Sequence, residues 1–186
     1  IDENDTGAGV FSLSELSLDA AHGAVVSGTD ASLFEVVSGQ LKLKDANRAD
    51  YEAKVSYQIT VTGVDTLGVS QVREVAVFVT DVNEAPEVSN PLADQQVVLS
   101  GAIPGYAYNV STAFSDIEGD TLTYSAQIED SAETVSALPS WLTIDRQTGV
   151  LTGTPTLADM GNLVIEVTAT DSDGLAVSDS FNLDVS

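Results

Sequence analysis

Apolar and polar residues alternate along most of this chain with the period of two that is typical of half-buried β-strands. Val, Ile, Thr and Tyr dominate the alternating segments, as they do in strands. The clearest of these segments are VSYQITVTGVD (55–65), REVAVFVTDV (73–82), LVIEVTATD (163–171) and FNLDVS (181–186). Turn residues punctuate the chain in HG, SGTD, TLG, IEGD, RQTG and DSDG. No long amphipathic helix is evident, so the pattern predicts an all-β protein made of sandwiches.

The length and one proline-containing segment predict two domains. The chain has 186 residues, which suits two sandwiches of about 100 residues each. The segment DVNEAPEVSNP (81–91) follows a complete strand and contains Pro86 and Pro91, neither of which can donate to a strand ladder. We therefore predict one domain over residues 1–85 and a second over residues 86–186.

A weak internal repeat suggests that the two domains are related. In each half a strand ends in an aspartate, a glycine turn follows, and a serine-containing strand comes next. The aspartates are Asp65 and Asp171, and the glycines are Gly68 and Gly174.

Charge and composition exclude several classes of function. The chain has 29 acidic and 6 basic residues, for a net charge of −23, and such a surface repels nucleic acid. There is no cysteine, which excludes disulfides and thiolate metal sites. No apolar run has the length of a membrane span, so we expect no membrane insertion. The carboxylates form either a solvated surface or clusters around hard cations.

The first half resembles a bacterial cadherin repeat. The matching residues are DEN near the start, GTDASLFEV, GQLKL, ADYE, YQITVTGVD and the closing DVNEAP. The second half is similar to a dystroglycan-type cadherin-like domain, also described as Ig-like. Its matching residues are AFSDIEGDTLTYSA, LPSWLTIDRQTGVLTGTP and IEVTATDSDG. The resemblance implies two tandem Greek-key β-sandwiches, as in large bacterial surface adhesins.

This resemblance also implies calcium at the joint between the domains, and it indicates which residues bind it. The expected ligands of the first domain are Glu3, Asp50 and Glu52, and those of the second are Asp116, Glu118 and Asp171. The linker is expected to supply Asn83 and Glu84 with the carbonyls of Val82 and Ala85, and Asp81 and Asp120 are further candidates. The chemistry agrees, because Ca²⁺ takes six to eight carboxylate and carbonyl oxygens. The same carboxylates without a cation would repel one another.

The sequence departs from the family pattern at two places. An Asp-x-Asp for calcium shared with a preceding domain is reduced to Asp19-Ala20-Ala21, although the partner from the later loop, Asp65, is present. We therefore expect a weak or absent site there. Glu118 stands where Asp is usual, and its longer arm can change the number of ions held.

The remaining candidates are aromatic residues and one histidine. Trp141, the only tryptophan, is expected on a strand in the core, with a sugar-stacking platform as the alternative. Tyr106 and Tyr108 are expected to pack together on one strand face. The single histidine, His22, precedes a glycine, and no G-x-S-x-G motif accompanies it, so we expect no enzyme.

Three functions remain open at this stage. The first is a calcium-stiffened adhesion or spacer module in an extracellular, cell-surface adhesin. The second is a carbohydrate-binding module, and the third is homophilic or protein-partner adhesion. We expect a monomer whose partners are neighbouring domains of the same parent chain. The chain opens in mid-pattern at Ile1, and we interpret it as a fragment of a longer protein.

Overall fold

The computed structural model of the chain describes residues 1–99, 105–129 and 135–186. The chain divides into two compact units, Ile1–Val82 and Asn83–Ser186, three residues before the boundary placed from the sequence. The described part of the chain contains strands and single 3₁₀ turns but no α-helix. Within the same residues, no helix is long and apolar enough to cross a membrane.

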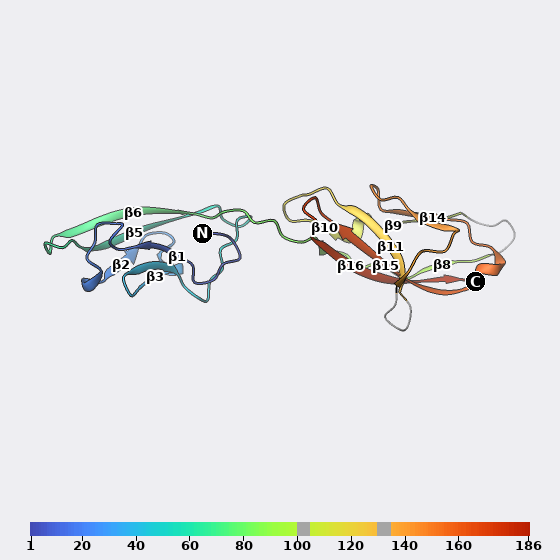
Figure 1. Cartoon of the computed structure of the whole chain (residues 1–186), viewed down its shortest axis with the longest axis horizontal. Coiled ribbons are helices and arrows are strands. Elements are labelled where there is room, and N and C mark those ends of the chain that lie inside the picture. The colour runs from blue at the N-terminus through green and yellow to red at the C-terminus, as the bar shows by residue number, and fades with distance from the viewer. Residues whose placement is uncertain (100–104, 130–134) are drawn as a thin grey trace. The chain divides into compact units, whose positions relative to one another are not determined.

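The first unit is a sandwich of two three-stranded sheets (Figure 1). One sheet has the order β1-β4-β3 and the other the order β2-β5-β6, and every strand pair within them is antiparallel. The strands are β1 (Gly9–Ser12), β2 (Ala24–Ser27), β3 (Phe34–Val37), β4 (Gln40–Leu43), β5 (Ser56–Val64) and β6 (Ser70–Phe78), with 3₁₀ turns η1 (Ala20–His22) and η2 (Ala31–Leu33).

Alternate residues of β5 and β6 face the core of this sandwich. Tyr57, Ile59 and Val61 are buried, while their polar neighbours are less so. They pack with Phe34, whose ring meets that of Tyr57 edge to face at 5.4 Å. The start of the chain pairs in parallel with the end of the unit through the bridge between Asp2 and Thr80.

The second unit carries its strands in three sheets, with orders β12-β11-β15-β16-β8, β13-β14-β9 and β10-β7. The strands are β7 (Glu87–Val88), β8 (Gln95–Val97), β9 (Tyr106–Asn109), β10 (Phe114–Ser115), β11 (Thr123–Glu129), β12 (Val135–Ser136), β13 (Leu142–Ile144), β14 (Val150–Gly153), β15 (Gly161–Thr170) and β16 (Ala176–Val185). The 3₁₀ turns are η3 (Ser111–Ala113) and η4 (Leu157–Asp159). The longest pairing joins β15 and β16, and β8 runs parallel to β16.

The all-β prediction is confirmed, and the four alternating segments coincide with β5, β6, β15 and β16. Their ends differ by a few residues, and the last strand begins five residues before Phe181. The glycines of the six predicted turns all have positive φ, between 65° and 102°. A side chain with a Cβ rarely adopts this conformation, which explains glycine at the two hairpin turns, Gly68 and Gly174.

Candidate metal-binding site

Glu3 ties three segments of the first unit together. Its side chain is only 3% exposed. Oε2 accepts the N–H of Tyr51 at 2.9 Å and Oε1 accepts the N–H of Val82 at 2.5 Å. The hydrogen bond from Tyr51 is the main cause that lowers the pKa of Glu3 below its usual value. Burial raises this pKa, but the bonds from Tyr51 and Val82 together outweigh it. A charged Glu3 therefore stays in place at neutral pH.

The other candidate ligands of the first unit lie nearer the surface. A carboxylate oxygen of Glu52 lies within 4.8 Å of one from Glu3, so these two side chains converge. Asp50 is exposed, and its Oδ1 accepts the N–H of Ala53 at 2.7 Å, which closes the turn that carries Glu52. Asp81 is exposed.

In the second unit, Asp171 organises the loop between β15 and β16. It is 5% exposed. Its Oδ1 accepts three backbone N–H groups, those of Asp173 (2.9 Å), Gly174 (2.6 Å) and Leu175 (2.8 Å), and its Oδ2 accepts Nδ2 of Asn83 at 2.9 Å. Burial alone would raise the pKa of Asp171, but these hydrogen bonds outweigh it and lower the pKa. The loop thus holds an ionised carboxylate beside Asn83.

Glu118 is in the opposite electrostatic situation. Burial, followed by the neighbouring carboxyls of Glu84 and Asp116, raises the pKa of Glu118 to about 7. Oxygens of Glu84 and Glu118 lie within 4.8 Å of one another. Both Oε atoms of Glu118 and Oδ2 of Asp116 are buried without a hydrogen-bond donor among the described residues. Close, desolvated carboxylates of this kind need a positive charge or a proton.

The loop after β10 is fixed to the loop after β15 by Asp120. Its N–H donates to Oδ1 of Asp116 at 3.0 Å, and its Oδ2 accepts the hydroxyl of Ser172 at 2.5 Å. Asp120 is therefore engaged with Ser172. Ala85, expected to contribute only a carbonyl, is exposed.

The structure thus brings the predicted residues together in two sets, one in each unit. Glu3 and Glu52 converge in the first unit, with Asp50 in the same turn as Glu52. In the second, Asn83 is bonded to Asp171, and Glu84 and Asp116 surround Glu118.

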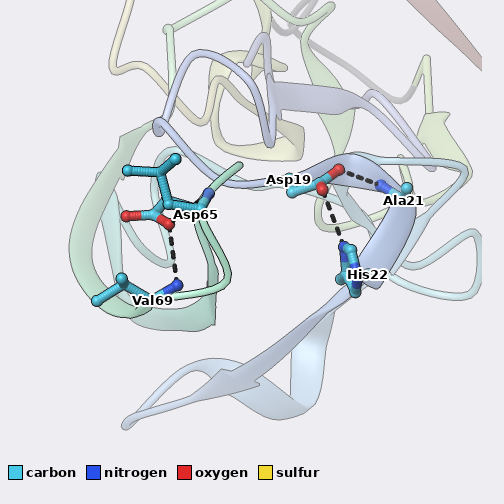
Figure 2. A network of polar contacts seen from close by, with 6 residues as sticks. Asp19, Ala21, His22, Asp65 and Val69 are labelled. Atoms are coloured by element: carbon cyan, nitrogen blue, oxygen red, sulfur yellow. Dashed lines mark hydrogen bonds and ion pairs between the residues drawn. The ribbon is translucent and has the colours of Figure 1, made fainter.

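Asp19 and Asp65, the pair with the missing acidic partner, each serve a local turn (Figure 2). Asp19 accepts the N–H of Ala21 and pairs with Nδ1 of His22, both at 2.9 Å. Asp65 accepts the N–H groups of Leu67 and Val69, each at 2.9 Å, and Nε2 of Gln71 at 3.0 Å. Each carboxylate thus accepts donors from its own turn, and the weak or absent calcium site stays a prediction.

One buried acid that the sequence did not single out is Asp30. It is 7% exposed, pairs with Nζ of Lys54 and accepts the N–H of Gln58 at 2.7 Å. The Lys54 bond is the main cause that lowers its pKa. Because these contacts join the start of η2 to β5 and to Lys54 just before it, the role of Asp30 is structural. In the sequence, only the segment GTDASLFEV contains a hint of it.

The aromatic predictions are correct in packing and wrong in one detail. Tyr106 is buried and Tyr108 packs against the same core from β9. Trp141 also packs against this core and is partly buried, but it occupies the turn just before β13 and not a strand. His22 is exposed and pairs only with Asp19 among the described residues.

Comparisons with known proteins define the class of these units. Residues 85–186 match the family model described as Putative Ig domain. Human Protocadherin-16 is 29% identical over 186 residues, which are 98% of this chain and 5% of that protein. The chain therefore spans only a small fraction of this relative.

Solved cadherin-domain structures match the whole chain in fold. Mouse protocadherin-24 EC1–3 matches with a TM-score of 0.60 and 21% identity over 99% of this chain and 60% of that chain. Cadherin domains 1–5 of protocadherin gamma B2 match with a TM-score of 0.62 and 20% identity over 100% of this chain and 38% of theirs. Human protocadherin-24 EC1–2 matches with a TM-score of 0.60 and 20% identity over 88% of this chain and 80% of that chain.

These findings establish the fold as tandem β-sandwiches similar to those of cadherin domains. The chain belongs to the Putative Ig domain family.

Proposed function

We propose that the chain is a calcium-stiffened spacer module of a large extracellular, cell-surface adhesin of the bacterial type. The bound calcium would join the two sandwiches and so hold a more distal binding domain away from the cell. Its partners would be the neighbouring domains of the same chain. Cadherin-like ectodomain repeats are typically extracellular, which supports this location.

The observation that carries the proposal is that most carboxylate oxygens of Glu118 and Asp116 are buried and lack hydrogen-bond donors. Three of their four carboxylate oxygens are buried without a donor among the described residues. After burial, the carboxyl of Glu84 contributes most to raising the pKa of Glu118. A divalent cation would remove the repulsion among these groups and would be coordinated by them. The oxygen-only donor set favours a hard cation.

A second supporting feature is the position of the two sets along the chain. The N–H of Val82 is bonded to Glu3 in the first unit, and the side chain of Asn83 is bonded to Asp171 in the second. Val82 and Asn83 are consecutive, so a single peptide bond separates the two sets in the sequence.

The test is isothermal titration calorimetry of CaCl₂ into the chelator-treated whole chain. We expect saturable binding that Asp116→Asn weakens at least tenfold, because a ligand charge is lost. Asp184→Asn is the matched control. It removes the same charge, but Asp184 lies near the end of β16, whereas the loop that carries Asp171 lies before the start of that strand. This variant should leave the calcium affinity unchanged. An absence of calcium binding, or equal effects of the two variants, would contradict the proposal.

A further inference from the structure

A second feature of the Ig-like unit is a shallow cavity of about 450 Å³, open to solvent, beside the sheet β9-β14-β13. Its lining includes the residues Trp141, Tyr106, Thr143, Thr152 and Thr154. The volume lies within the range of ordinary small-molecule sites. It shares no residue with the two sets of candidate calcium ligands.

Trp141 is held firmly at the wall of this cavity. A Cβ on Gly153 would lie 2.8 Å from Cε3 of the indole and 2.5 Å from the Trp141 carbonyl oxygen, so the ring occupies the space that this glycine leaves. The Trp141 carbonyl also accepts the N–H of Thr154 at 3.2 Å. The indole is only partly buried, and the cavity contains a fixed aromatic surface that solvent can reach.

Hydroxyl groups line the cavity next to this aromatic surface. Thr143 and Thr152 are cross-strand partners, and both are exposed. Oγ1 of Thr143 donates to the carbonyl oxygen of Thr152 at 3.4 Å and lies 3.5 Å from Oγ1 of Thr152, and both hydroxyls keep acceptor capacity. Thr154, two residues along from Thr152, is exposed as well. The hydroxyl of Tyr106 is buried, so the hydroxyls that a ligand can reach are those of the threonines.

The cavity lining is uncharged in a strongly acidic protein. All seven lining residues are Gly, Thr, Tyr or Trp, whereas the chain as a whole has a net charge of −23. An anionic ligand would be repelled by the surrounding field, and a cation would find no carboxylate in the lining. The complementary ligand is therefore neutral, with an apolar face and several hydroxyls.

We propose that this cavity binds a neutral saccharide. The C–H face of a pyranose ring would stack on Trp141, because the negative π face of an aromatic ring attracts such partially positive hydrogens. The threonine hydroxyls would exchange hydrogen bonds with the sugar hydroxyls. Calcium takes no part in this contact.

The test begins with an array of neutral and acidic glycans, probed with the whole chain in calcium and again in chelator. The neutral oligosaccharide with the strongest signal is then titrated while tryptophan fluorescence is followed. Trp141 is the only tryptophan, so a change in its emission reports this cavity directly. We expect binding of neutral glycans in both conditions, with a change in Trp141 emission.

Two isosteric variants locate the site without removing the indole. Thr152→Val keeps the shape and the strand preference of the residue and should weaken binding about three- to tenfold through the lost hydrogen bond. Thr168→Val is the matched control, because Thr168 also forms a cross-strand hydroxyl pair, with Ser178 on a different sheet, and should leave binding unchanged.

The proposal is overturned if no neutral glycan binds the folded chain, or if acidic glycans are preferred. Binding that leaves Trp141 emission unchanged, that is lost in chelator, or that weakens equally in both threonine variants would also overturn it. Failure of this site would leave calcium binding at Glu118 intact, and failure of calcium binding would leave the sugar titration intact. The two proposals can therefore fail separately.

Discussion

Replacing Glu118 by glutamine should change the stability of the second unit in opposite directions with and without calcium. In chelator, the wild-type side chain is destabilising when ionised, because it is buried beside the carboxyls of Glu84 and Asp116. Glutamine keeps the shape and removes the charge. The variant should therefore be more stable than the wild type in chelator at pH 7.5.

The size of this gain follows from the pKa. A carboxyl whose pKa rises from 4.5 to about 7 on folding costs at most roughly 3.5 kcal/mol at ~1.4 kcal/mol per pKa unit. Glu118 is only half-buried as a residue, and solvent screening reduces the cost to about 1–2 kcal/mol. For a domain of about 100 residues, 1 kcal/mol corresponds to a shift of ~4–8 °C in the melting temperature.

The same pKa gives a pH dependence with a definite sign. The folded state retains the proton on Glu118 more strongly than the unfolded state. In chelator, the wild-type unit should therefore lose stability as the pH rises from 4.5 to about 7 and stay level above that. Glu118→Gln lacks this contribution to the decline.

Calcium should reverse the order of the two proteins. A cation that binds only the folded state at about 100 times its dissociation constant adds about 2.7 kcal/mol to the wild type. Glutamine lacks the negative charge, so the variant binds calcium more weakly and gains less. In millimolar calcium the variant should therefore melt below the wild type.

The assay is thermal unfolding of the whole chain followed by tryptophan fluorescence, because Trp141 lies in the second unit and is the only tryptophan. Glu87→Gln is the matched control, since Glu87 is an exposed glutamate of the same unit. The difference between its melting temperature and that of the wild type should be the same in calcium and in chelator. A Glu118→Gln shift of the same sign in calcium and chelator would refute the reasoning.

Three other predictions follow from single contacts. Asp171→Asn should lower the fluorescence-detected melting temperature even in chelator, because the carboxylate holds three loop N–H groups; an unchanged temperature in chelator would make its role purely calcium-dependent. Gly153→Ala should destabilise the second unit by about 1–3 kcal/mol, since its Cβ would lie 2.5 Å from the Trp141 carbonyl oxygen; the same melt measures it, and a neutral result would show that the turn relaxes. Asp30→Asn should destabilise the first unit at neutral pH, as seen in calorimetry. Because the pKa of Asp30 is lowered, chiefly by Lys54, the difference from wild type should shrink as the pH falls below its ordinary value of 3.8, and a constant difference would argue against the ion pair.

The long strands were predictable because each carries enough alternating residues to show its period. β5 and β15 are nine and ten residues long, and their apolar positions face one core. Strands such as β7 and β10 have only two residues each, too few for any periodicity, and depend on their neighbours for their conformation. Trp141 was placed on a strand for a related reason, since the apolar run that contains it begins in a turn.

The resemblance predicts which residues belong to the candidate site, but it does not predict their electrostatics. A resemblance could identify Asp171 and Glu118 as acids of the same site. Only the coordinates distinguish Asp171, which accepts several hydrogen bonds, from Glu118, whose buried oxygens have no donor among the described residues. Likewise, no sequence pattern indicates that the carboxylate of Asp19 is hydrogen-bonded to the N–H of Ala21 and to the ring of His22.

The most direct test of the central claim is small-angle X-ray scattering of the whole chain in millimolar calcium and in chelator. If calcium joins the two units, the profile in calcium should be that of one rigid particle, and the profile in chelator that of two folded units on a flexible linker. Superimposable profiles in the two conditions would contradict the account, and would leave the acidic residues as a solvated surface.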